Sequence, residues 1–427
     1  MATINPQELL RFATAGSVDD GKSTLVGRIL HDTKSIMVDT LASVERASQA
    51  KGLTTTDLAL LTDGLRAERE QGITIDVAYR YFSTEKRSFI LADTPGHIQY
   101  TRNMVTGAST AELALVLVDA RHGVVEQTRR HVAIVALLGV RHLVLAVNKM
   151  DLVDYDLNRF ANVERQFAEI ARSLGILDAV AIPVSALDGD NVVFRSEKMP
   201  WYNGPSLLEH LENVPLGLDV ASEPLRFPVQ YVIRPRNDIH HDYRAYAGKV
   251  AHGVVRVGDE VVVQPAGHRT KIAAIDGLSG PVEFAVASQS VALRLSHNFD
   301  ISRGDLISSG SDNAPLLQDI IAEVCILADR SLDFGDRVTV QHGTQTTVAK
   351  VSEVIARLDL KTLRPIKSAE PLVLNDIGVI RLRLSRPLPI DDYSRLRKTG
   401  AFLLIDPSDG STIGAGMATK QGSEFSI

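Results

Sequence analysis

A glycine-rich segment near the N-terminus has the spacing of a phosphate-binding loop. Gly16, Gly21, Lys22 and Ser23 satisfy the pattern G-x-x-x-x-G-K-[ST], between an apolar run and a helical pattern. Glycines let successive backbone N–H groups face phosphate oxygens, where the dipole of the following helix favours anions. Lys22 would place its charge against the β- and γ-phosphates, and the Ser23 hydroxyl can ligate Mg²⁺. The residues expected to contact the nucleotide are Gly16, Ser17, Val18, Asp19, Asp20, Gly21, Lys22, Ser23 and Thr24.

A second motif, N-K-x-D, indicates which base is bound. Asn148, Lys149 and Asp151 follow a later apolar run. The Asp151 carboxylate can accept hydrogen bonds from guanine N1–H and the exocyclic amine, while Asn148 can reach the opposite edge. Adenine offers neither donor pattern, and a site that leaves a buried polar group unpaired discriminates strongly. The backbone of Ser185, Ala186 and Leu187, after the next run, is expected to close the pocket, so the predicted ligand is GTP or GDP.

Two further segments have the residues needed for a hydrolytic switch. Asp93, Thr94, Pro95 and Gly96 follow an apolar run; Asp93 can hold Mg²⁺ through water, and the Gly96 N–H can meet the γ-phosphate. His97 comes next, where its imidazole could orient a water in line with that phosphate, so we predict a catalytic role. Upstream, Thr74 is a candidate for a second hydroxyl ligand of Mg²⁺, giving Ser23, Thr74 and Asp93 as the metal set.

The elements that must position these motifs alternate between strands and helices. Apolar runs at 9–16, 89–93, 113–120, 142–149 and 179–185 predict strands buried on both faces, and 126–138 and 157–174 have helical spacing. This alternation indicates a parallel-rich sheet covered by helices on both faces. After a Pro- and Gly-rich break, the pattern becomes short alternating strands separated by turns. We therefore expect a multi-domain α/β + β chain: a nucleotide-binding domain at 1–215 and β-barrels at 222–312 and 315–427.

Composition restricts the classes of protein that fit. The 427 residues suit several domains, and the net charge of −6 gives no general basic field, so nucleic acid is not expected as a partner. Cys325 is the only cysteine, which excludes an intramolecular disulfide and suits a reducing compartment. The N-terminus lacks the pattern of a secretory signal, and the apolar runs are too short to cross a bilayer. We expect a cytoplasmic protein without membrane contact.

The ordered motifs resemble those of the elongation-factor superfamily of GTPases, over essentially the whole chain. Within it, the segments GSVDDGKSTLVGRIL, DGLRAEREQGITIDVAYRYF, ADTPGHIQYTRNMVTGAS and FPVQYVIRP are similar to the GTPase subunit of heterodimeric sulfate adenylyltransferase. Members that carry tRNA usually have histidines where this chain has Ser17 and Asp20. The resemblance implies that GTP hydrolysis drives formation of adenosine 5′-phosphosulfate and pyrophosphate from ATP and sulfate on a separate catalytic subunit. It also implies that Val18 and Ile73 form an apolar gate beside the catalytic His97.

An absence in the sequence supports this division of labour. We find no good H-x-G-H or S-G-G-x-D-S loop for adenylyl transfer, so the sulfate chemistry is expected on the partner. Some family members continue into an adenylylsulfate kinase with its own phosphate-binding loop, and this chain has no second such loop; whether it is a free subunit or a fragment stays open. Two alternatives remain. One is an elongation-factor-like GTPase that delivers aminoacyl-tRNA, and the other is a nucleotide-gated binding module with negligible turnover.

Overall fold

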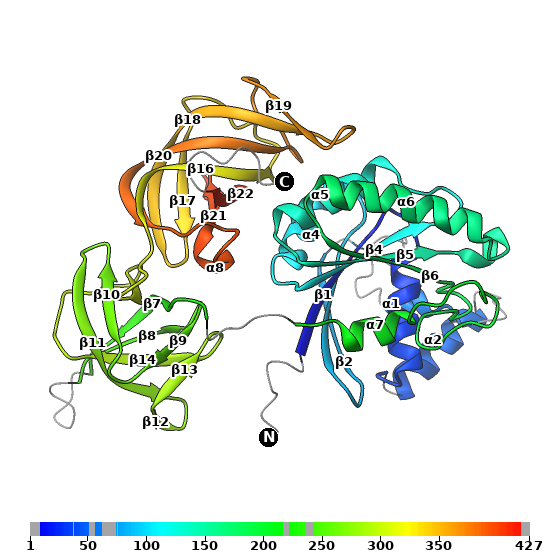
Figure 1. The fold of residues 1–427 in the computed structure, drawn as a ribbon, viewed down its shortest axis with the longest axis horizontal. Coiled ribbons are helices and arrows are strands. Elements are labelled where there is room, and N and C mark those ends of the chain that lie inside the picture. Colours follow the sequence, from blue (N-terminus) through cyan, green and yellow to red (C-terminus); the bar gives the residue numbers. More distant parts are fainter. Residues whose placement is uncertain are drawn as a thin grey trace. The chain divides into compact units, whose positions relative to one another are not determined.

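The structure is a computed structural model, which describes residues 9–36, 38–50, 56–61, 74, 76–216, 222–235 and 243–419. These residues divide into two compact units (Figure 1). The first is the α/β part and extends to Leu216, and the second contains both β-domains. The fold class predicted from the sequence is confirmed: a domain with a parallel-rich sheet is followed by two closed six-stranded β-barrels.

The first unit is built on one six-stranded sheet in the order β2-β3-β1-β4-β5-β6. Only the edge pair β2–β3 is antiparallel, and the other neighbours are parallel. Every residue of β4 is buried, as expected for a central strand covered on both faces. The strands are β1 (Leu9–Ala15), β2 (Ala78–Ser83), β3 (Ser88–Asp93), β4 (Leu113–Asp119), β5 (His142–Asn148) and β6 (Asp178–Pro183).

Helices cover both faces of this sheet. Figure 1 shows α4, α5 and α6 on one face and α1 and α7 on the other. The apolar residues of α1 and α7 share a core with Phe12, Phe82 and Phe89, whose rings stack or meet edge to face. The helices are α1 (Lys22–Asp32), α2 (Val38–Ala50), α4 (Thr101–Ala108), α5 (Glu126–Leu137), α6 (Leu157–Ser173) and α7 (Leu207–Asn213), with short 3-10 helices η2 (Leu58–Leu61), η3 (Ile98–Tyr100) and η4 (Met150–Val153).

The first barrel closes through antiparallel pairs in the ring order β10-β15-β7-β8-β14-β11, because β11 pairs again with β10. Its core collects the apolar residues that face inward, which alternate with outward-facing residues along the strands; they include Phe227, Val263 and Leu293. The strands of this part are β7 (Arg226–Ile233), β8 (Ala245–Lys249), β9 (Val254–Arg256), β10 (Glu260–Gln264), β11 (His268–Gly277), β12 (Gly280–Val282), β13 (Phe284–Val286), β14 (Ser290–Leu295) and β15 (Leu306–Ser309).

The second barrel closes in the ring order β17-β21-β22-β16-β20-β18, since β18 pairs again with β17. Closure removes the exposed edges that an open sheet of this size would present. Its elements are β16 (Leu316–Ile326), β17 (Arg337–His342), β18 (Gln345–Asp359), β19 (Arg364–Lys367), β20 (Ile377–Pro389), β21 (Ala401–Ile405) and β22 (Thr412–Thr419), with the short helix α8 (Arg397–Gly400).

A buried ion pair joins the two barrels within the second unit. Arg226 on β7 is fully buried and donates to both carboxylate oxygens of Asp391 at 2.8 Å, in a bidentate arrangement. Arg226 also donates to the carbonyl of Asp312, and the Thr399 hydroxyl donates to Asp391. Because every charged atom of this pair has a partner, burial of the pair is compensated by its hydrogen bonds.

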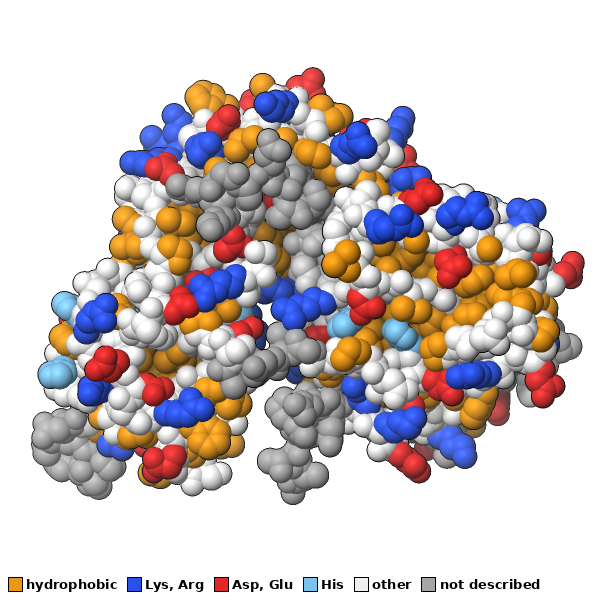
Figure 2. Space-filling model, viewed as in Figure 1, with side chains coloured by type: hydrophobic (Ala, Val, Ile, Leu, Met, Phe, Trp, Pro, Cys, Tyr) orange, Lys and Arg blue, Asp and Glu red, His pale blue; other side chains and the backbone are white. Residues whose placement is uncertain are grey.

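The helices and the surface charges bear on possible partners. Among the described helices, none combines the length and the apolar character that crossing a bilayer requires. On the face shown in Figure 2, basic and acidic side chains are interspersed over the described residues of both units.

Candidate nucleotide-binding site

The first unit brings four of the predicted motif segments to one edge of its sheet. The phosphate-binding loop follows β1, the segment Asp93–Gly96 completes β3, the N-K-x-D residues end β5, and the loop of residues 185–187 follows β6. These strands are parallel, so their carboxyl ends lie at the same edge. In open α/β sheets, ligands bind in the crevice at this edge, where the strand order reverses.

The phosphate-binding loop is packed too closely for side chains at its glycines. Gly21 has φ 92° at the N-terminus of α1, and a Cβ added there would lie 2.4 Å from Asn148 Nδ2. Lys22 begins α1, and its ammonium donates to the carbonyls of Gly16 at 2.7 Å and Ser17 at 2.8 Å. Burial lowers the pKa of Lys22, and the nearby carboxylate of Asp93 acts in the opposite direction. The loop therefore holds a cation at the helix N-terminus, which suits an anionic ligand.

Asp20 lies in the same loop and contacts the loop itself. Its carboxylate accepts the backbone N–H of Ser17 at 2.6 Å, and burial raises the pKa of Asp20. The Ser17 hydroxyl is buried and has no hydrogen-bond partner among the described residues. Asp20 therefore shapes the loop, while the Ser17 hydroxyl is left available.

The segment after β3 lies against the phosphate-binding loop. A Cβ added at Gly96 would lie 2.4 Å from Lys22 Nζ and 2.3 Å from the Gly16 carbonyl oxygen, so only glycine fits. Asp93 and Thr94 are held by Thr14, whose hydroxyl donates to Asp93 Oδ1 at 2.8 Å and accepts the Thr94 N–H at 3.3 Å. Our sequence reasoning missed Thr14; its signal is a polar residue within an apolar strand, next to the loop.

His97 is the N-cap residue of the helix η3, directly after this segment. Its Nδ1 accepts the backbone N–H of Gln99 at 3.3 Å, and its ring is half-buried, 6.0 Å from the ring of Tyr100. Thr74, predicted as a metal ligand, is half-buried and lies shortly before β2. Ile73, assigned by resemblance to the apolar gate, lies outside the described residues, whereas its expected partner Val18 is 37% exposed.

The N-K-x-D residues connect the phosphate-binding loop to the loop at 185–187. Asn148 donates from Nδ2 to the Asp20 carbonyl at 2.8 Å and accepts the Ala186 N–H on Oδ1 at 2.9 Å. Both ends of this side chain are thus occupied by backbone groups, whereas the sequence had suggested contact with the base. Lys149 donates to the Asp19 carbonyl. Asp151 accepts the Ser185 hydroxyl on Oδ1 at 2.6 Å, which orients its carboxylate.

An acidic residue that sequence reasoning missed anchors Lys149. Asp119 ends β4 and is almost completely buried. Its Oδ2 lies 3.1 Å from Lys149 Nζ, and Arg121 makes a two-pronged ion pair with the carboxylate. Burial opposes ionisation, but the hydrogen bonds from Arg121 and Lys149 prevail and hold the pKa of Asp119 well below its ordinary value. Its position at the end of a strand beside the motif strands was the available signal.

Helix α5 also reaches the segment after β3. Gln127 donates from Nε2 to the Gly96 carbonyl at 3.3 Å and to His131 Nε2 at 3.0 Å. Burial lowers the pKa of His131 to about 3, and the positive charges of Lys22 and Arg130 act in the same direction. His131 is therefore neutral, and it accepts from Gln127. Nothing in the local sequence pattern distinguishes these two residues from an ordinary amphipathic helix.

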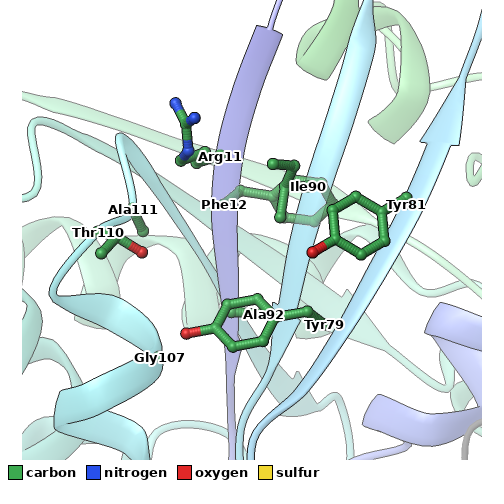
Figure 3. A pocket seen from close by; sticks show the side chains of 9 residues that line it. All are labelled: Arg11, Phe12, Tyr79, Tyr81, Ile90, Ala92, Gly107, Thr110 and Ala111. Atoms are coloured by element: carbon green, nitrogen blue, oxygen red, sulfur yellow. The ribbon is translucent and has the colours of Figure 1, made fainter. Parts of the chain in front are cut away.

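A separate hollow of about 210 Å³ lies on the sheet beside α4, and none of the predicted nucleotide-contacting residues lines it. Figure 3 shows Tyr79 and Tyr81 of β2 over the sheet, with Arg11 at the far side of the hollow. The lining residues are Arg11, Phe12, Tyr79, Tyr81, Ile90, Ala92, Gly107, Thr110 and Ala111.

Family profiles match both the first unit and the C-terminal part of the second. The profile of the Elongation factor Tu GTP binding domain matches residues 7–220, and that of the GTP-eEF1A C-terminal domain-like family matches residues 319–419. The chain is 56% identical over 413 residues to the "Bifunctional enzyme CysN/CysC" of two strains of Mycobacterium tuberculosis, covering 96% of this chain and 67% of theirs. Among solved structures, sup35 complexed with GMPPNP or with GDP matches at 25% and 24% identity, with TM-scores of 0.44 and coverage of 97% of this chain and 94% of sup35.

Proposed function

Because the chain belongs to the GTPase subunits of sulfate adenylyltransferase, within the elongation factor Tu type of GTPase, we propose that its GTP hydrolysis drives sulfate activation on a separate catalytic subunit. That subunit would join ATP and sulfate into adenosine 5′-phosphosulfate and pyrophosphate. The 56% identity to the "Bifunctional enzyme CysN/CysC" supports the coupling function most. Within the structure, GTP binding is best supported by the link through Asn148, which ties the phosphate-binding loop to the loop at 185–187. One nucleotide can then span a phosphate-binding end and a base-binding end built from adjacent segments.

At the phosphate end, the residues proposed to bind GTP are those of the loop Gly16–Thr24 and of Asp93–Gly96. The Lys22 ammonium donates to two backbone carbonyls of this loop, so its charge lies within the loop that would hold the phosphates. The close approach of Gly96 to Lys22 places the backbone of the second segment beside the same charge. This proximity explains how the presence of a γ-phosphate would be transmitted to the segment after β3.

At the base end, Asp151 is proposed to select guanine. The Ser185 hydroxyl donates to one of its oxygens, which fixes the plane of the carboxylate toward the loop at 185–187. Lys149 supports this end indirectly, by joining Asp119 to the phosphate-binding loop. The exposed Leu187 side chain would cover one side of the base.

The residues proposed for Mg²⁺ have a donor set that suits it. Ser23 lies in the first turn of α1, and the buried Asp93 acts electrostatically on Lys22, which places both residues at the phosphate end. Hydroxyl and carboxylate oxygens are the ligands that Mg²⁺ prefers, and Thr74 would add another hydroxyl. When bound, Mg²⁺ would neutralise charge on the β- and γ-phosphates.

His97 is proposed to orient the water that attacks the γ-phosphate. Since its Nδ1 accepts the Gln99 N–H, the neutral ring has its proton on Nε2. Nε2 can then donate to a water oxygen, so His97 would position this water and would not remove its proton in this arrangement. The bond between the γ-phosphorus and its bridging oxygen breaks as the water oxygen bonds to phosphorus. The proton that the water loses passes to a phosphate oxygen or to solvent, and the products are GDP and phosphate.

The His97 role has a direct kinetic test. His97→Ala should lower kcat for GTP hydrolysis by about 10²- to 10⁴-fold with little change in GTP affinity, because only the transition-state contact is lost. His97→Gln retains a donor and should recover part of the rate. An unchanged kcat in His97→Ala would reject this role and favour a binding module with negligible turnover.

The coupling function is tested with the partner. Adding GTP to this protein, its catalytic subunit, ATP and sulfate should raise the amount of adenosine 5′-phosphosulfate in proportion to GTP hydrolysed. The His97→Ala variant should bind the subunit without this increase. If product formation were the same with and without GTP, the coupling proposal would be wrong even if the chain hydrolyses GTP. The relatives at 56% identity favour this function over delivery of aminoacyl-tRNA. We also propose that the protein acts in the cytoplasm, because its single cysteine suits a reducing compartment.

A further inference from the structure

The helix that follows the phosphate-binding loop also holds the base-binding loop, through one side chain. Arg28 lies on α1, two turns after Lys22, and is half-buried. Its Nε donates to the Ala186 carbonyl at 3.2 Å, and its Nη2 donates to the Leu187 carbonyl.

We propose that Arg28 is a positioning residue for guanine binding: it fixes the loop at 185–187 and, through that loop, the carboxylate of Asp151. The proposal rests on the base-binding role given to these residues above. Arg28 is too far along α1 to belong to the phosphate-binding motif, and its partners are 158 and 159 residues away in sequence.

A continuous series of hydrogen bonds carries the effect from Arg28 to Asp151. The Leu187 carbonyl that Arg28 holds belongs to the same planar peptide as the Asp188 N–H, so fixing one fixes the other. That N–H donates to the Ser185 hydroxyl oxygen at 3.2 Å. The same hydroxyl donates its proton to Asp151 Oδ1 at 2.6 Å. Arg28 therefore decides where Ser185 points, and Ser185 decides where the carboxylate points.

The second carbonyl adds control of the loop backbone. The Ala186 carbonyl and the Leu187 N–H belong to one planar trans peptide and point in opposite directions. When the Arg28 guanidinium holds the carbonyl, it therefore also fixes the direction of this N–H. The N–H on the opposite side of Ala186 is held by Asn148. Arg28 thus orients two successive peptides of the loop from α1. The rigid fork of an arginine side chain suits two adjacent carbonyls better than the single ammonium of a lysine does.

The environment of Arg28 keeps its side chain in this place. Asp32, one turn later on α1, lies 3.6 Å from its Nη1. Gly189 lies beside the stem of Arg28: a Cβ added there would be at ordinary contact distance, 3.6 Å from Arg28 Cδ, and its φ of 89° favours glycine. Beyond the loop, Asp188 is held separately by Lys198 at 3.0 Å. Removing Arg28 should therefore loosen residues 185–187 while the following segment stays anchored.

The test compares a ligand that has a base with one that has none. Affinities of the full chain for GDP and for inorganic tripolyphosphate are measured in the wild type, Arg28→Ala and Arg28→Lys. We expect the Kd for GDP to rise about tenfold in Arg28→Ala, with faster GDP dissociation. The reason is that Arg28→Ala removes charge-assisted hydrogen bonds to the loop that holds the base, and not hydrogen bonds to GDP itself. Tripolyphosphate affinity should stay within about twofold of the wild type, and Arg28→Lys should fall between.

Arg46→Ala is the matched control, because Arg46 is an exposed arginine of the same unit that donates to Ala42 of its own helix α2. An unchanged GDP affinity in Arg28→Ala would overturn the proposal. An equal loss for GDP and tripolyphosphate would also overturn it, since Arg28 would then act through the helix or the fold. If Arg28→Ala did not fold, Arg28→Lys would decide by the same comparison. Failure of the wild type itself to bind GDP would refute the proposed function instead.

Discussion

Acidification should destabilise the first unit, and the buried His131 should contribute to this effect. This imidazole on α5 is 2% exposed and accepts from Gln127, which also donates to the Gly96 carbonyl. Lys22 and Arg130 bring positive charge toward it. Protonation would add a third positive charge in a buried place and would turn the accepting nitrogen into a donor that faces the Gln127 amide. The folded state therefore resists protonation, while the unfolded chain does not.

The magnitude follows from the two pKa values. In the folded unit the pKa of His131 is lowered from 6.5 to about 3. Because the unfolded state binds the proton below pH 6.5 and the folded state does not, the free energy of unfolding decreases as the pH falls from 6.5 toward 3. The loss is about 1.4 kcal/mol per pH unit, so going from pH 7 to pH 5 costs about 2 kcal/mol through this group alone.

The single tryptophan makes the assay specific to the right unit. Trp201 lies in the first unit, where its indole donates to the Tyr155 carbonyl at 3.0 Å. Urea unfolding followed by its fluorescence is measured at pH 7 and pH 5 for the wild type and for His131→Gln, which cannot titrate. The wild type should lose about 2 kcal/mol more than the variant between these pH values. Carboxylates contribute equally to both proteins, so an identical pH effect in the two would refute the reasoning.

Two further substitutions test the packing of each unit. Arg226→Ala leaves the Asp391 carboxylate buried without its main partner, so it should destabilise the second unit by about 3–5 kcal/mol. The urea transition of the β-rich circular dichroism signal should shift, while that of Trp201 fluorescence should not. Equal shifts of both signals would contradict this prediction. Gly27→Val should displace η2 from α1 and lower the free energy of unfolding by about 1–3 kcal/mol, because a Cβ at Gly27 would lie 2.2 Å from the Leu58 carbonyl oxygen. Unchanged hydrogen exchange at residues 58–61 would argue against this contact.

The amino-acid sequence was sufficient for the fold class and for the order of the chemical motifs. Buried parallel strands and half-buried barrel strands differ in their apolar periodicity, and this difference separated the α/β part from the β part. The phosphate-binding loop, the segment after β3 and N-K-x-D are each a few residues long, so their chemistry can be recognised locally. The same motifs, in the same order, also carried the resemblance that the comparisons confirm.

Only the tertiary structure decided how these motifs are held together. Asn148 meets Asp20 across 128 residues, Thr14 meets Asp93 across 79, and Arg28 meets the loop after β6 across 158. No local spacing encodes such pairs. The motif that identifies Asn148 does not indicate Asp20 as its partner, and Thr14 and Arg28 taken alone are an ordinary strand threonine and an ordinary helix arginine. These residues meet only when the parallel strands bring their carboxyl ends to one edge of the sheet. Burial there makes an unpaired polar group costly, so each buried polar group is stabilised by a partner that forms a hydrogen bond with it.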